Sequence, residues 1–243
     1  MKAHLIAAGK FHDIDFARLE LLKLLAELPE VRTSVACDFA NADGLAPEDL
    51  LITYTCDLAP STSQTDDLTR FLERGGRWLA LHGTNSLLRM ADDGKVDVPD
   101  EVPDFMQLLG SRFAAHPPIG PFKVMVTDPE HALTQGLRDF RIEDELYLVR
   151  RTADLHVLLH TSFSGRCDEF RDCDWDEAEV PVLYERRLSE GAVLYLTLGH
   201  CRGHYDLQPI TRFWPHPQRC SWNYPIFYEL LRRGLRWGFA HRG

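Results

Sequence analysis

An apolar strand that ends abruptly at a histidine constrains this chain more than any other feature. Residues 77–83 read Arg-Trp-Leu-Ala-Leu-His-Gly, and an amphipathic segment over 65–74, closed by Gly75 and Gly76, precedes them. A helix, a short turn and a buried strand together form the repeating unit of α/β proteins. Ligands of open α/β sheets bind beyond the carboxyl ends of the strands, so His82 lies where chemistry is expected.

The same alternation runs along the whole chain. Hydrophobic patterning predicts strands over 3–9, 31–37, 50–55, 122–126, 155–160, 180–184 and 192–198, and helices after residue 14, over 105–109 and over 225–240. Strands that alternate with helices predict an α/β fold with a mostly parallel central sheet and right-handed crossovers. Because no repeat or linker divides the sequence, we expect a single domain over residues 1–243.

Composition narrows the possible partners and location. The formal charge of -10 argues against a nucleic-acid or anionic-membrane partner, each of which needs a basic surface. No apolar run approaches the roughly 18 residues of a membrane span. The six cysteines contain no C-x-x-C pair, and free thiols in a reducing compartment predict a cytoplasmic protein. The acidic segments 92–101 and 167–179 are expected to be exposed loops.

Four places combine ionisable side chains with the ends of predicted elements. They are His82, His116 before Pro117, the pair Asp144 and Glu145, and His200 after the strand over 192–198. In an extended segment Asp144 and Glu145 point to opposite sides, so one carboxylate can face a cleft while the other braces the loop. The set predicts a divalent metal site, zinc first, with the ligands His82, His116, Glu145 and His200. Two alternatives stay open: metal-free acid–base chemistry, or imidazoles that each bind only a backbone carbonyl.

Other residues near these positions are candidates for substrate binding or nucleophilic attack. Gly83, Asn85, Tyr147 and His204 are the substrate-binding candidates, although Gly83 also suits a tight turn and Tyr147 also suits core packing. Ser86 and Cys201 are the nucleophile candidates near these element ends, and neither lies in a G-x-S-x-G motif.

Taken together, these stretches resemble the trehalose-utilisation, or ThuA-like, family. The resemblance rests on the order of stretches that run nearly from end to end of the chain: 51–55, 71–83, 109–113 with 116–117, 128–131, 134–137, 144–147, 181–184, 193–200 and 233–237. It implies a class I glutamine-amidotransferase-like domain, which is a flavodoxin-like three-layer sandwich, and a role in the catabolism of trehalose-related disaccharides and their keto-sugar derivatives. Glutamine amidotransferases of this fold carry a cysteine nucleophile where this chain has His82-Gly83, so glutamine hydrolysis is not expected.

The leading hypothesis is therefore a carbohydrate-active enzyme with His82, Glu145 and His200 as catalytic residues, around a divalent metal or without one. Its partner would be a small-molecule carbohydrate, and a homo-oligomer stays open. One alternative is a non-catalytic sugar-binding or regulatory module. Another is an amidotransferase-like hydrolase that uses Cys201.

Overall fold

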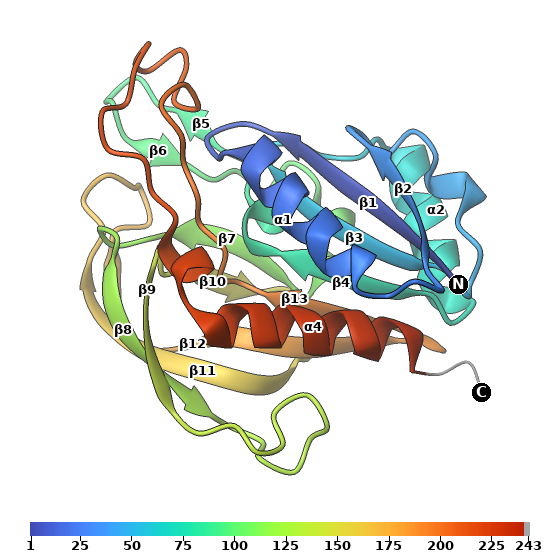
Figure 1. Ribbon diagram of the computed structural model, residues 1–243. Coiled ribbons are helices and arrows are strands. Elements are labelled where there is room, and N and C mark those ends of the chain that lie inside the picture. Colours follow the sequence, from blue (N-terminus) through green and yellow to red (C-terminus); the bar gives the residue numbers. More distant parts are fainter. Residues whose placement is uncertain (241–243) are drawn as a thin grey trace.

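Nine strands form one sheet in the order β2-β1-β3-β4-β13-β12-β11-β8-β9 in this computed structural model, which describes residues 1–240 (Figure 1). The strands are β1 (Lys2–Gly9), β2 (Arg32–Ala36), β3 (Leu50–Cys56), β4 (Arg77–Leu81), β5 (Arg89–Met90), β6 (Val96–Asp97), β7 (Ser111–Ala115), β8 (Gly120–Val126), β9 (Phe140–Asp144), β10 (Leu148–Arg151), β11 (His156–Arg166), β12 (Asp174–Leu188) and β13 (Gly191–Leu196). The α-helices are α1 (Ile14–Ala26), α2 (Thr62–Glu73), α3 (Pro103–Leu109) and α4 (Pro225–Phe239), and the 3-10 helices are η1 (Ala42–Gly44), η2 (His82–Asn85) and η3 (Cys220–Asn223).

The parallel part of the sheet has the strand order of a flavodoxin-like fold. Strands β2, β1, β3, β4 and β13 pair in parallel, and β12, β11, β8 and β9 extend the sheet with antiparallel pairings. Counted in chain order, the parallel strands follow the 2-1-3-4-5 pattern, with its switch point between β1 and β3. The predicted α/β class with a large, mostly parallel central sheet is confirmed.

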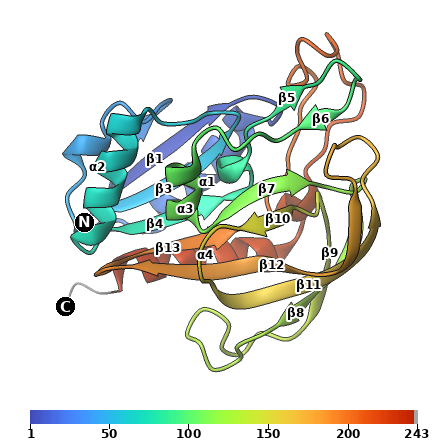
Figure 2. The same ribbon diagram turned by 180° about the vertical axis from the view of Figure 1, so that it is seen from behind.

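Helices cover both faces of the parallel strands. Helices α1 and α4 lie on the face toward the viewer in Figure 1, and α2 and α3 lie on the opposite face, seen in Figure 2. Each face buries its own apolar core, one centred on α1 and α4 and the other on α2 and α3. A third apolar cluster packs the short sheet of β7 and β10 against the long β11–β12 hairpin. The result is a three-layer arrangement with an antiparallel extension.

The structure departs from the predicted elements at several boundaries. Helix α2 starts at Thr62 because Ser61 and Gln64 form a capping box there. The predicted exposed loop over 167–179 is wrong in its second half, since β12 begins at Asp174 and pairs with β11. Strands β7, β9 and β10 had no clear alternating pattern and were not predicted. Within residues 1–240, no helix has both the length and the apolar character that a membrane span requires.

Gly9 is required at the end of β1 by its conformation and by its surroundings. Its φ is +115°, and a Cβ at this position would lie 1.9 Å from the carbonyl oxygen of Cys56 in β3. We expect Gly9→Ala to lower the free energy of unfolding by about 2–5 kcal/mol, the sum of left-handed backbone strain and overpacking. Urea denaturation measures this loss.

Gly94→Ala is the matched control for the Gly9 variant. Gly94 also has a positive φ, +79°, but a Cβ there would meet nothing within 4 Å. Its cost should be strain alone, about 1–2 kcal/mol. Equal losses in the two variants would mean that the contact with Cys56 does not matter.

Candidate active site

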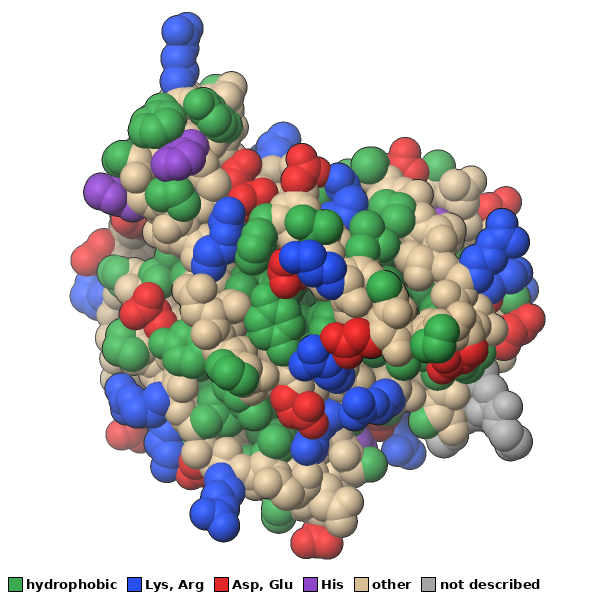
Figure 3. Space-filling model, viewed as in Figure 1, with side chains coloured by type: hydrophobic (Ala, Val, Ile, Leu, Met, Phe, Trp, Pro, Cys, Tyr) green, Lys and Arg blue, Asp and Glu red, His purple; other side chains and the backbone are tan. Residues whose placement is uncertain are grey.

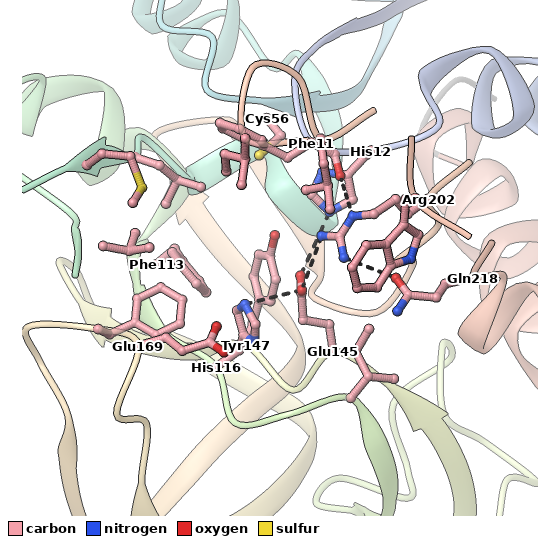
Figure 4. A pocket seen from close by; sticks show the side chains of 18 residues that line it. Phe11, His12, Cys56, Phe113, His116, Glu145, Tyr147, Glu169, Arg202 and Gln218 are labelled. Carbon is pink, nitrogen blue, oxygen red and sulfur yellow. Dashed lines mark hydrogen bonds and ion pairs between the residues drawn. The ribbon is translucent and has the colours of Figure 1, made fainter. Parts of the chain in front are cut away.

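Three histidines that follow parallel strands meet one glutamate at the carboxyl edge of the sheet. His12 follows β1, His82 follows β4 and His200 follows β13, and Glu145 comes directly after β9. All four are buried, and one potential ligand atom from each lies within 4.8 Å of the others. Figure 4 shows the Glu145 carboxylate between His116 and Arg202, with His12 above it.

The spacing of the four ligand atoms suits a small cation. Glu145 Oε2 lies 3.2 Å from His200 Nδ1, 3.5 Å from His82 Nε2 and 3.8 Å from His12 Nε2. The Nε2 atoms of His12 and His82 are 2.9 Å apart. A tetrahedral ion with bonds of about 2.0–2.2 Å separates its ligands by roughly 3.3–3.6 Å, so the observed distances bracket the required value.

The outer nitrogen of each imidazole already has a carbonyl acceptor. His82 Nδ1 donates to the Thr197 carbonyl at 2.8 Å, and His200 Nε2 donates to the side-chain oxygen of Gln218 at 2.9 Å. His12 Nδ1 lies 3.3 Å from the carbonyl of Lys10. With those protons placed outward, the inner nitrogens present lone pairs to one another and to the carboxylate. Metal-bound histidines are held in this way, and a cation would relieve the repulsion among the lone pairs.

His116 lies beside this cluster rather than in it. Its Nε2 is 3.2 Å from Glu145 Oε1, the oxygen that turns away from the three inner histidines, and its Nδ1 is 2.8 Å from the Pro117 carbonyl. Both ring nitrogens face acceptors, so the two contacts are hydrogen bonds only when the ring is doubly protonated. The cluster therefore differs from the predicted metal set in one member, because His12 occupies the position that was expected for His116.

Electrostatics keep the carboxylate ionised and His12 neutral. Burial disfavours the charged form of Glu145, but the nearby imidazoles of His116 and His200 hold the pKa of its carboxyl well below the usual range. Burial lowers the pKa of His12 to about 3, although the nearby carboxylate of Glu145 acts in the opposite direction. An ionised carboxylate and a neutral imidazole are the forms in which Glu145 and His12 would bind a divalent cation.

Asp144, the neighbour of Glu145, holds the backbone of the site in place through hydrogen bonds. Its fully buried carboxylate accepts the backbone N–H groups of Glu145 and Gly199 at 2.8 Å each and that of His200 at 3.1 Å. It also accepts the hydroxyl of Ser221. The Asp144 side chain thus fixes both the loop of Glu145 and the loop of His200. This agrees with the expectation that one carboxylate of the pair faces the cleft while the other holds the loop.

Unusual backbone conformations aim the histidines inward. His82 has a φ of 43°, a left-handed conformation that a non-glycine residue adopts at a cost. Gly83 then passes so close to β3 that a Cβ would lie 2.6 Å from the Thr55 carbonyl oxygen. Gly199, with a φ of 130°, makes the corresponding turn before His200. The strand ends therefore turn sharply, and the imidazoles project over the edge of the sheet.

A cavity of about 650 Å³ opens over the cluster. Its wall includes His12, Glu145 and Tyr147, and the ring of Tyr147 lies 4.2 Å from that of His82. Tyr147 is thus the predicted substrate-binding residue that the structure brings to the cavity. His82 and His200 lie beneath its floor, fully buried.

The other predicted substrate-binding residues are not among those that line the cavity. Gly83 packs against β3, and the side-chain amide of Asn85 donates to Ser111 in the interior at 2.8 Å. His204 stacks on Phe213 with ring centroids 4.7 Å apart. The structure therefore places Gly83, Asn85 and His204 outside the wall of this cavity.

Two residues of the site were missed from the sequence. His12 lies in the turn after β1 rather than at the strand end, so the strand-then-histidine pattern did not select it. Arg202 lies 4.0 Å from Glu145 and donates to the Gln218 side chain at 3.1 Å. The contact between Arg202 and Gln218 forms only when the segment between them folds, so no sequence pattern indicates it. For His12 a sequence signal did exist, because Gly9 shortly before it is typical of a tight turn at a strand end.

Cys201 does not have the surroundings of a nucleophile. Its thiol is buried, lies 3.2 Å from the hydroxyl of Tyr54 and 3.4 Å from the Asp13 carbonyl, and is absent from the cavity wall. Burial raises the pKa of the thiol to about 12, so almost none of it is thiolate at neutral pH.

Comparisons with known proteins agree with this architecture. The family model described as trehalose utilisation (ThuA) matches residues 12–214. Among solved structures, a ThuA-like protein from Parabacteroides merdae superposes with a TM-score of 0.70 at 14% identity, covering 100% of this chain and 91% of that one. A ThuA-like protein from Bacteroides uniformis superposes with a TM-score of 0.64 at 18% identity, and the match covers 98% of this chain and 91% of that one. A β-galactosidase from Rahnella sp. R3 superposes with a TM-score of 0.58 at 11% identity, and the match covers 99% of this chain but only 31% of the β-galactosidase. The curated proteins gave no match.

Proposed function

This chain belongs to the trehalose utilisation family, ThuA, and from that premise we propose that it is a metal-assisted enzyme acting on a sugar ring bound above Glu145. Family membership supports a role connected with carbohydrates. The observation that carries the proposal is the convergence of three imidazole lone pairs and one carboxylate oxygen within 4.8 Å. Trehalose-related disaccharides and their keto-sugar derivatives are the substrates to assay first.

The donor set fits a divalent ion of the first transition row, and zinc suits it best. His12, His82, Glu145 and His200 would hold the ion, and of these His12 and Glu145 line the cavity. When bound, such an ion polarises a sugar carbonyl or lowers the pKa of a bound water.

The residues around the cluster suit proton transfer in a lyase or hydrolase reaction. His116 keeps part of its side chain exposed to the cavity, 22%, and lies 3.2 Å from Glu145 Oε1. In its doubly protonated form it would donate a proton to a leaving oxygen, and the Glu145 carboxylate would stabilise the charged ring before transfer. Arg202 would help to hold the orientation of that carboxylate.

Metal analysis of untagged protein tests the proposal directly. We expect close to one equivalent of a divalent metal per chain by elemental analysis. After chelation, calorimetric titration with zinc chloride should show one site. Zinc at 100 times its dissociation constant should then stabilise the protein by about 2.7 kcal/mol in thermal unfolding. Turnover that persists unchanged after complete metal removal would favour metal-free acid–base chemistry.

A second group of ligand-type side chains provides the matched control. His131, His156 and Glu185 also bring ligand atoms within 4.8 Å of one another, but the oxygens of Glu185 accept from Trp237 at 3.1 Å and Arg187 at 2.9 Å. His82→Ala should therefore lose the metal, and His156→Ala should keep it. Sugar binding without turnover of any native or oxidised disaccharide would indicate a non-catalytic module.

We also assign the fold to the class I glutamine-amidotransferase-like group. The assignment is supported by the 2-1-3-4-5 order of the parallel strands and by helices on both faces of the sheet. Under this assignment His82 stands where the amidotransferases carry their nucleophile. Loss of glutaminase chemistry follows, since an imidazole held by Thr197 cannot replace a thiolate in acyl transfer.

A further inference from the structure

The cavity has two chemically different ends. The deep end is polar: His12, His116 and Arg202 surround Glu145 at 3.8, 3.2 and 4.0 Å, and Gln218 contacts Arg202. The outer end is apolar and comes from two other segments of the chain. Leu88, Met90 and Val96 belong to the arm of β5 and β6, and Leu207, Ile210 and Trp214 belong to the segment between Arg202 and Gln218.

These two segments lie side by side at one end of the molecule, as both Figure 1 and Figure 2 show. Backbone contacts hold each of them in place. Arg202 and Gln218 exchange hydrogen bonds of 2.9 and 2.8 Å at the base of the long segment, and Val96 donates to the Glu169 carbonyl at 2.7 Å. The apolar outer end is therefore part of the folded structure rather than a loose tip.

The exposed fractions of the lining residues show which end of the cavity opens to solvent. Glu145 is 4% exposed, whereas Met90 and Ile210 are 60% and 61% exposed although both line the cavity. Figure 3 shows hydrophobic side chains gathered on the protruding segment at the upper left, and exposed Tyr205 and Phe213 belong to the same segment. Large apolar side chains in contact with water at a cavity mouth mark a place where an apolar group binds favourably.

The second sugar of a disaccharide does not match this mouth. Every hydroxyl that is buried without a hydrogen-bonding partner costs free energy, and Leu88, Met90 and Ile210 offer no donor or acceptor. Besides Glu169, the outer end offers the indole N–H of Trp214, which has no hydrogen-bonding partner in the protein. One donor and one carboxylate do not satisfy the several hydroxyl groups of a second sugar. A volume of about 650 Å³ holds one sugar ring and a second group of similar size.

We infer that the substrate is a glycoside whose non-sugar part is an apolar alkyl or aryl group, bound between Met90 and Ile210. The sugar ring then occupies the polar end, and this part of the inference rests on the proposed function. Selectivity among glycosides of the same sugar is set by the apolar contact, because hydrophobic burial increases with the apolar area removed from water.

Calorimetric binding to zinc-loaded protein tests this inference with methyl, butyl and hexyl glucosides of both anomers, with trehalose, and with the matching alkanols. Affinity should rise about two- to fourfold per buried methylene, so hexyl glucoside should bind at least about tenfold tighter than methyl glucoside and tighter than trehalose. The Met90→Ser, Ile210→Ser double variant should remove most of this dependence on chain length. Leu19→Ser, on α1 and 52% exposed, is the control and should keep it.

The outcomes separate the two proposals. The inference would be overturned if methyl and hexyl glucosides bound with equal affinity and short and long alkanols did so too. It would also be overturned if trehalose bound more tightly than hexyl glucoside. Alkanols that bind as tightly as the corresponding glucosides would contradict the sugar-binding part of the proposed function. In that case the dependence on chain length would still support the apolar subsite.

Discussion

Glu145→Gln is expected to raise the dissociation constant for zinc at least about 100-fold and to abolish turnover. The substitution keeps the shape of the side chain but replaces a charged oxygen that lies 3.2–3.8 Å from three imidazole nitrogens. Loss of a residue that only supports a ligand already costs about 10–100-fold in metal affinity, so loss of the charged ligand itself should cost at least the upper end of that range. Calorimetric titration of metal-free protein with zinc measures the change.

Glu143→Gln is the control for this prediction. Glu143 lies two positions earlier in the chain, carries the same side chain and is exposed on β9. Its substitution removes the same charge from the protein and should leave zinc affinity and turnover unchanged. A Glu145→Gln protein that still binds one equivalent of zinc with unchanged affinity would contradict the proposed metal centre.

Much of the fold could be predicted because its parallel strands are buried on both faces. Such strands read as continuous apolar runs, and the strands expected over 3–9, 50–55 and 192–198 were found close to those bounds. Strands β7 and β9 span only five residues each, and β10 spans four. Patterns that short do not distinguish a strand from a loop.

The candidate site was predictable only where it follows a strand directly. His82 and His200 each stand at the end of an apolar run, and both were selected for that reason. His12 and Arg202 lie in turns whose positions depend on contacts with distant residues, such as the hydrogen bond from Asp13 N to the Cys201 carbonyl at 2.9 Å. Sequence spacing carries no information about such contacts, so His116 was preferred to His12 as a ligand.

The apolar end of the cavity was also beyond sequence analysis. Among the aromatic residues between 209 and 223, only Trp214 lines the cavity, and Trp222 packs against Tyr54 in the interior. Met90 and Ile210 are far apart in the chain and belong to segments that look like ordinary surface loops. Their shared role appears only when both segments fold over the same opening.

Asp144→Asn is expected to destabilise the protein by about 2–5 kcal/mol and to weaken zinc binding about 10–100-fold. Both oxygens of Asp144 accept hydrogen bonds: one from Glu145 N and His200 N, and the other from Gly199 N and Ser221. An asparagine retains one acceptor oxygen and turns an NH₂ group toward the remaining donors. The backbone N–H that faces this NH₂ group is left unsatisfied in the interior.

Asp144→Asn would weaken zinc binding by displacing the ligands, because Asp144 is not itself one of the four proposed ligands. Its hydrogen bonds hold the backbones of Glu145 and His200 so that their side chains meet at 3.2 Å. Ser221→Ala removes only one donor to the same carboxylate and should cost about 1 kcal/mol with little change in zinc affinity. Urea denaturation of metal-free protein and zinc titration measure the two effects separately. If Asp144→Asn lowered stability but left zinc affinity at the wild-type value, the carboxylate would support the fold without orienting the metal ligands.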